Sequence, residues 1–69
     1  MPSAVTIGQK WAAWIPGRQQ WLLATVIRCE YQAVTLRCDK RYGLAVDGDL
    51  RVDEDTMLKN RNLFRFVEA

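Results

Sequence analysis

The chain has 69 residues, of which 49% are hydrophobic and 26% are charged, and its formal net charge is +2. This length suits one small domain, and the high apolar content argues against intrinsic disorder. The net charge is too small for a dedicated nucleic-acid-binding domain, and so short a chain leaves little room for an enclosed active-site cavity.

The sequence shows no pattern of secretion or membrane insertion. No basic region followed by a long apolar stretch opens the chain, and the longest apolar run, residues 21–27, has the length of a strand. Two cysteines, Cys29 and Cys38, are too few for a disulfide framework, and without any His they do not complete a zinc site within one chain. We therefore expect a cytoplasmic protein with buried free thiols, no cofactor and no metal.

The first predicted strand precedes a tight turn. Apolar and polar residues alternate from Ile7 to Ile15, with Gln9 as the exception on the apolar side. Period-two alternation predicts a half-buried strand. The dipeptide Pro16-Gly17 then marks a turn that ends this strand.

The apolar run at residues 21–27 predicts a second strand. Its β-branched residues and the flanking turn signals favour a strand over a buried helix segment. A four-residue loop gives the hairpin a definite register, with the pairs Ile15–Gln20, Trp14–Trp21, Ala13–Leu22 and Trp11–Ala24. In this register Trp14 and Trp21 form a cross-strand aromatic pair on one face, worth up to about 1 kcal/mol.

Two further hairpin signals follow a turn near residues 30–32. Residues 33–38 alternate again, with Val34, Leu36 and Cys38 facing inward, which predicts a third strand. The tripeptide Asp47-Gly48-Asp49 lies between the alternating segments 44–46 and 50–52. Asp-Gly in such a position predicts a hairpin.

The last part of the chain predicts a helical turn and a final strand. Acidic residues open the segment 53–60, Lys59 lies near its end, and Asn60 suits a left-handed residue that ends a helix. The final strand covers residues 63–67, with Phe64 and Phe66 on one face.

Several short segments are similar to those of a known family. An aromatic residue followed by Ala-x-Val occurs as Trp21-Leu-Leu-Ala24-Thr-Val26, and a third strand ends at Asp39 before Tyr42-Gly43. Together with the strand layout, these segments resemble SH3-like barrels, and most nearly their Tudor branch, over about residues 8–68.

The resemblance implies a specific architecture. It is an all-β, small SH3-like barrel of five or six antiparallel strands with one short helical turn before the last strand. We expect residues 1–6 to form a flexible N-terminal arm with few anchoring contacts, and residues 7–69 to form the single domain. In the Tudor branch, loop aromatics build a cage for methylated ligands, and Trp14, Trp21 and Tyr42 are placed roughly like cage residues.

Signals of catalysis are poor. The chain has no His, the commonest general base, and its one Ser lies in the expected arm. The acidic residues between Asp47 and Asp55 lack the spacing of a calcium loop. We therefore expect a protein that is not an enzyme.

The strongest candidate for a functional surface is aromatic. If Trp11 faces the core, then Trp14, Trp21 and Leu23 face outward, and an exposed apolar face usually marks a partner surface. The predicted partner-binding residues are Trp14, Trp21, Leu23 and Tyr42, and the predicted partner is another protein chain, including a second copy in a homodimer. In the alternative, the second strand bends and buries Leu23 and Ile27 between two sheets.

A second hypothesis assigns the same aromatic residues to nucleic acid. The predicted contacts are Arg18, Arg37, Lys40 and Arg41. Cations beside aromatic platforms suit single-stranded nucleic acid, because bases stack on the rings while the cations attract phosphates. The low net charge ranks this hypothesis below a protein partner, and we expect no membrane partner.

Overall fold

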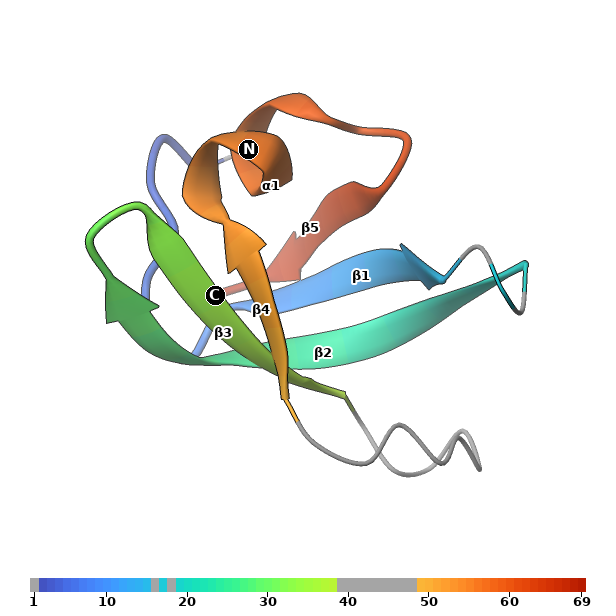
Figure 1. The fold of residues 1–69 in the computed structure, drawn as a ribbon, viewed down its shortest axis with the longest axis horizontal. Coiled ribbons are helices and arrows are strands. Elements are labelled where there is room, and N and C mark those ends of the chain that lie inside the picture. The colour runs from blue at the N-terminus through green and yellow to red at the C-terminus, as the bar shows by residue number, and fades with distance from the viewer. Residues whose placement is uncertain (1, 16, 18, 39–48) are drawn as a thin grey trace.

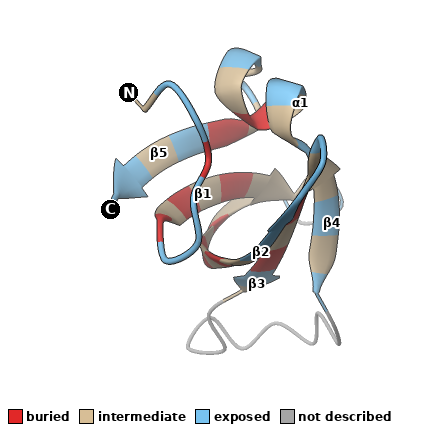
Figure 2. Cartoon of the chain, turned by 90° about the vertical axis from the view of Figure 1, so that its left-hand side faces the viewer, coloured by how far each residue is buried: buried red, intermediate tan, exposed pale blue. Residues whose placement is uncertain are grey.

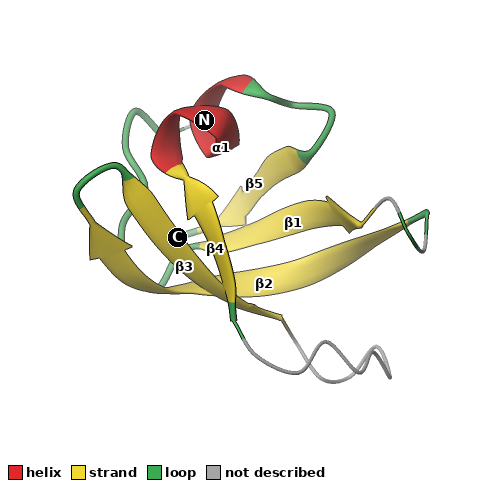
Figure 3. Ribbon diagram, in the orientation of Figure 1, coloured by secondary structure: helices red, strands yellow, loops and turns green. Residues whose placement is uncertain are grey.

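The chain folds into an antiparallel sheet accompanied by a short helix (Figure 1). The structure, a computed structural model, describes residues 2–15, 17, 19–38 and 49–69. The elements are β1 (Lys10–Ile15), β2 (Gln20–Glu30), β3 (Ala33–Cys38), β4 (Leu50–Asp53), α1 (Glu54–Lys59) and β5 (Phe64–Glu68). The predicted small all-β fold, with antiparallel strands and one short helix before the last strand, is confirmed (Figure 3).

The sheet has two open edges, and the helix lies between them. Its strand order is β4-β3-β2-β1-β5, so no ladder joins β4 to β5 in the described residues. Helix α1 contacts both edge strands and buries Met57 completely in the core (Figure 1). The helix therefore covers the gap that a closing ladder would fill in a barrel.

The β1–β2 hairpin has the predicted register at every predicted pair. Trp14 lies opposite Trp21, and Trp11 lies opposite Ala24. The flanking pairs, Ile15–Gln20 and Ala13–Leu22, also agree. Because side chains alternate across a strand, this register fixes which residues of the hairpin face the core.

Strand β2 is long because it serves two neighbours. Its first part pairs with β1, and its second part pairs with β3 from Ala24 onward. The register shifts between Val26 and Arg28, which leaves Ile27 as an extra residue. Such a bulge bends a strand, so β2 turns from one partner toward the other.

The core lies on the concave side of the sheet. Buried and half-buried positions alternate along β1, as the red and tan bands of Figure 2 show. The buried hydrophobic cluster consists of Val5, Trp11, Ala13, Ala24, Val26, Val34, Leu36, Met57 and Phe64. Full burial of one large apolar side chain contributes about 1.5–3 kcal/mol, so this cluster dominates the stability of so short a chain.

The N-terminal segment is anchored, in contrast to the expected arm with few contacts. Val5 is buried in the core, and its carbonyl accepts a hydrogen bond from the Cys29 thiol. Gln9, the exception to the alternation, is 7% exposed, whereas Ile7 is 67% exposed. The predicted start of alternation at Ile7 is therefore wrong, and β1 begins at Lys10.

Gln9 tolerates burial because both polar atoms of its side chain have hydrogen-bond partners. Its Oε1 accepts from Trp11 Nε1 (3.1 Å) and from the Thr6 amide (3.2 Å), and its Nε2 donates to the Ala4 carbonyl (3.3 Å). A buried amide is tolerated when its donors and acceptors are satisfied. This one side chain ties the segment before β1 to the central core tryptophan.

Helix α1 forms where the acidic residues predict it. The Asp53 carboxylate accepts a hydrogen bond from the Thr56 amide (3.3 Å), as an N-cap residue does. The prediction of a left-handed Asn60 is wrong, because its φ is −94° and its amide continues the helical bonding to the Thr56 carbonyl. The predicted hairpin at 47–49 and the strand at 44–46 fall mainly outside the described residues.

Candidate interaction surface

One side of the sheet carries aromatic and apolar residues that do not belong to the core. Trp14 and Trp21 pair across the hairpin, and Leu23 pairs with Ala12, which also pairs with Arg65 of β5. Their parity is opposite to that of buried Trp11, so they lie on the other side of the sheet. We call Trp14, Trp21, Leu23 and Arg65 the outer aromatic face.

The two outer indoles and one guanidinium pack against one another. The Trp14 and Trp21 rings meet edge to face, with centroids 5.5 Å apart and an interplanar angle of 60°. The guanidinium carbon of Arg65 lies 4.4 Å from the centroid of the Trp21 ring. Aromatic pairs and cation–π contacts of this kind each contribute about 0.5–1.5 kcal/mol. These contacts therefore hold the three side chains in defined positions.

The outer aromatic face remains partly open to solvent. Trp14, Trp21, Leu23 and Ile27 are all half-buried, and none of them packs into the core cluster. The bend in β2 is present, but it does not bury Leu23 or Ile27 in a second core as the alternative supposed. Val67, at the end of β5, is 50% exposed. The sheet thus has a packed inner side and an outer side with accessible apolar area.

Only some of the predicted contact residues can be placed. Tyr42, Arg18, Lys40 and Arg41 lie outside the described residues. Arg37 pairs with Thr25, which also pairs with Lys10, so these residues form one row across the outer side. That row lies about 13 Å along β2 from Trp21, given a rise of about 3.3 Å per residue. The Arg37 guanidinium is engaged by Asp49 at 3.2 Å.

Arg65 is the residue of this surface that the sequence did not assign. The sequence feature that could have indicated it is its position between Phe64 and Phe66, two residues expected to share the opposite face. The alternation places Arg65 outward, but its contact with Trp21 depends on the pairing of β5 with β1. That pairing joins the two ends of the chain, and no local pattern reveals it.

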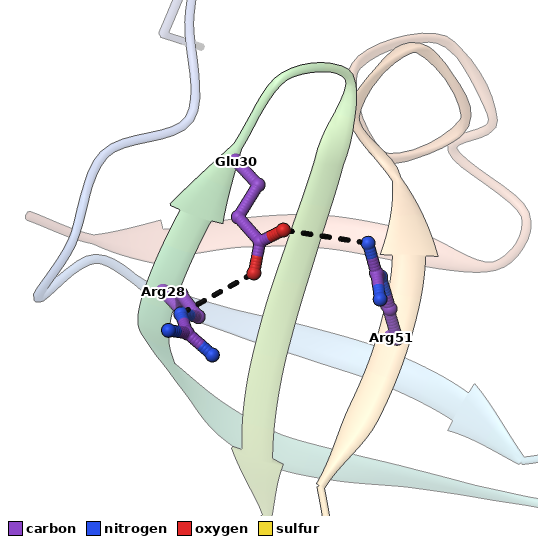
Figure 4. A network of polar contacts seen from close by, with 3 residues as sticks. All are labelled: Arg28, Glu30 and Arg51. Atoms are coloured by element: carbon purple, nitrogen blue, oxygen red, sulfur yellow. Dashed lines mark hydrogen bonds and ion pairs between the residues drawn. The ribbon is translucent and has the colours of Figure 1, made fainter.

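On the other half of the sheet, one glutamate lies between two arginines (Figure 4). Glu30, at the end of β2, forms an ion pair with Arg28 Nε at 3.3 Å and accepts a hydrogen bond from Arg51 of β4 at 3.5 Å. All three side chains are well exposed, and exposed pairs contribute only about 0–1 kcal/mol each. The network is therefore a solvated set of ion pairs that adds little to the stability of the sheet.

The two thiols are free but less buried than expected. Cys29 is exposed and Cys38 is half-buried against the core, so the prediction of buried thiols is wrong for Cys29. Two causes raise the pKa of the Cys29 thiol. The larger is partial desolvation of the thiol by the surrounding protein, and the smaller is the nearby Glu54 carboxylate. Burial and then the Asp49 carboxylate raise the pKa of Cys38. A raised pKa leaves less thiolate and makes a thiol a poorer nucleophile.

The described surface carries shallow hollows. One of about 250 Å³ lies along β5 and is lined by Arg61, Phe64, Arg65 and Phe66. The others lie at the two ends of α1 and are lined by polar and charged residues. The side chains that the structure describes include no cluster of three or more groups able to hold a metal ion.

Two further findings bear on the surroundings and relatives of the chain. Within the described residues, no helix combines the length and apolarity that a bilayer crossing requires. Comparisons with protein-family models, with curated proteins and with solved structures found no match to this chain.

Proposed function

We propose that this protein is a non-catalytic interaction module that binds another protein chain through its outer aromatic face, with a second copy of itself as the partner. The observation that carries the proposal is the Trp14–Trp21 pair, which lies away from the core and is only half-buried. Trp and Arg are the residue types most enriched among interface residues that dominate binding energy.

A second copy suits this face because the face is complementary to itself. It offers an indole pair and the Arg65 guanidinium side by side, so two copies related by a two-fold axis can each place a cation against an aromatic ring. A short chain also has a small core, and dimerisation adds buried apolar area that the monomer lacks.

Sedimentation at several protein concentrations tests the proposal. We expect wild type to associate reversibly and Trp14→Ala to associate about tenfold or more weakly, the effect of losing about 1.4 kcal/mol at an interface. Tyr31→Ala is the matched control, because Tyr31 is 90% exposed on the β2–β3 turn and away from this face. Circular dichroism establishes that each variant is folded.

Two results would contradict the proposal. One is a wild-type protein that remains monomeric at every concentration. The other is a folded Trp14→Ala variant that associates as strongly as wild type, because the indole would then contribute nothing to the contact.

Single-stranded nucleic acid is the second candidate, and one observation favours it. Arg65 stacks on Trp21, and Lys10 and Arg37 lie on the same side of the sheet. We rank nucleic acid below a protein partner, because the ion pair with Asp49 neutralises Arg37, one of the predicted phosphate contacts. Binding of oligo-dT that falls steeply with salt and is lost in Trp21→Ala would support it, and a flat salt response would exclude phosphate contacts.

We also propose that the fold belongs to the SH3-like barrels and that the protein lies in the cytoplasm. Five antiparallel strands, the bent β2 and the helix before β5 support the SH3-like resemblance and its Tudor branch. The free thiols Cys29 and Cys38 support a reducing compartment such as the cytoplasm.

A further inference from the structure

The hollow along β5 has the composition of a binding groove. Two arginines, Arg61 and Arg65, flank it, and two phenylalanines, Phe64 and Phe66, complete its lining. Its volume of about 250 Å³ is below the roughly 300–1,000 Å³ of typical small-molecule sites. The groove therefore has room for one or two side chains of a peptide, and not for a cofactor.

Arg65 is held in place on two sides. Its Nε donates to the carbonyl of Arg61 at 3.4 Å, and its guanidinium lies against the Trp21 ring. A guanidinium has five N–H donors in a fixed plane, so most of them remain available after the bond to Arg61. A cation fixed in this way loses little conformational entropy when it binds an anion.

The charge of the groove is not balanced by neighbouring side chains. In the ion pairs of the described residues, Arg28 and Arg51 share Glu30, Arg37 pairs with Asp49, and Lys59 pairs with Asp55. Arg61 and Arg65 take part in none of these pairs, and no acidic residue lines the groove. Two arginines that line one groove without an acidic partner favour a carboxylate-bearing ligand.

The groove also lies on an edge strand. Among the described strands, β5 pairs only with β1. Helix α1 contacts β5 without forming a ladder, so the other edge of β5 has no strand partner. An extended peptide binds such an edge through its backbone and places alternate side chains into adjacent hollows. The edge, the apolar lining and the arginines thus point to the same kind of ligand.

We propose that this groove binds an extended peptide segment of a partner protein in which an acidic side chain adjoins an apolar one. The apolar side chain packs mainly on half-buried Phe66, because Phe64 is only 8% exposed, and the carboxylate pairs with Arg61 and Arg65. This site shares Arg65 with the outer aromatic face but is distinct from it, because Arg61, Phe64 and Phe66 take no part in that face.

Fluorescence anisotropy of a labelled peptide that alternates Val and Glu tests the proposal. We expect saturable binding by the full chain, and binding at least about tenfold weaker for the same peptide with Gln in place of Glu. Arg61→Glu should weaken binding by at least the same factor. Lys59→Glu is the matched control, because it makes the same charge change at an exposed residue outside the groove and should retain near wild-type affinity.

The two proposals fail separately. Trp14→Ala should weaken self-association and retain peptide binding. Arg61→Glu should weaken peptide binding and retain self-association. Equal binding of the Gln and Glu peptides, equal losses in Arg61→Glu and Lys59→Glu, or no binding by wild type would each overturn the groove proposal. Competition by oligo-dT that depends on Arg61 would assign the groove to phosphate and overturn it as well.

Discussion

The two sides of the β1–β2 hairpin carry similar residues in very different environments. Trp11 has no exposed surface, donates a hydrogen bond to Gln9 and meets Phe66 edge to face at 5.6 Å. Trp14, on the opposite side of the same strand, is half-buried and packs on Trp21 instead of on the core. Strand register, and not hydrophobicity, decides which tryptophan is buried in the core and which remains half-exposed on the other side.

Truncation of the inner tryptophan should have the largest effect. Trp11→Ala removes a fully buried indole and leaves a cavity, so we expect a loss of about 3–5 kcal/mol in the free energy of unfolding. Trp14→Ala should cost about 1 kcal/mol or less, the scale of an aromatic pair. Urea unfolding measures both, and equal losses would remove the distinction between the two sides.

Replacement of the buried Gln9 should have the next largest effect on stability. Gln9→Leu leaves the Trp11 indole N–H without its acceptor inside the core, at a cost of about 1–3 kcal/mol. Gln20→Leu is the control, because Gln20 is half-buried at the start of β2. If both variants unfold at the same urea concentration, the Gln9 contacts are not what anchors the N-terminal segment.

The sequence predicted the parts of the fold that depend on local patterns. The Pro16-Gly17 turn and the alternation around it predicted the register of the hairpin, and the acidic residues before Thr56 predicted α1. Gln9 was missed because a single polar residue in an apolar series has no local explanation. Its burial depends on bonds to Ala4, Thr6 and Trp11 that form only in the folded chain.

The helix cap offers a smaller perturbation of the inner side. Asp53→Ala removes the acceptor for the Thr56 amide and should cost about 0.5–2 kcal/mol, because α1 carries Met57 into the core. Asp55→Ala removes the same charge from the same turn but loses only an exposed ion pair with Lys59. Similar unfolding midpoints for the two variants would show that charge, and not capping, accounts for the effect.

The thiols should give the smallest effect, seen only at high pH. The pKa of each thiol is raised above its ordinary value of 9.0, so above that pH the unfolded chain loses a proton that the folded chain keeps. Stability is therefore fully present below pH 9.0 and falls as the pH rises through the raised pKa. Urea unfolding below and above pH 9.0 should show a smaller fall for Cys29→Ser/Cys38→Ser than for wild type.

The candidate surface was predictable in part, for the same physical reason as the fold. Trp14, Trp21 and Leu23 were assigned together because the hairpin register is a local property. Arg65 and the groove along β5 were not assigned, because β5 meets β1 only when the two ends of the chain come together. Contacts between distant segments of the chain leave no periodic signal in the sequence.

The concentration dependence of thermal unfolding tests the central claim most directly. A folded protein that associates is stabilised by association, so its unfolding midpoint rises with protein concentration. We predict this rise for wild type and for Tyr31→Ala, and a clearly smaller rise over the same concentrations for Trp14→Ala. A constant midpoint for wild type, or the same rise in Trp14→Ala, would contradict a role for the outer aromatic face in self-association.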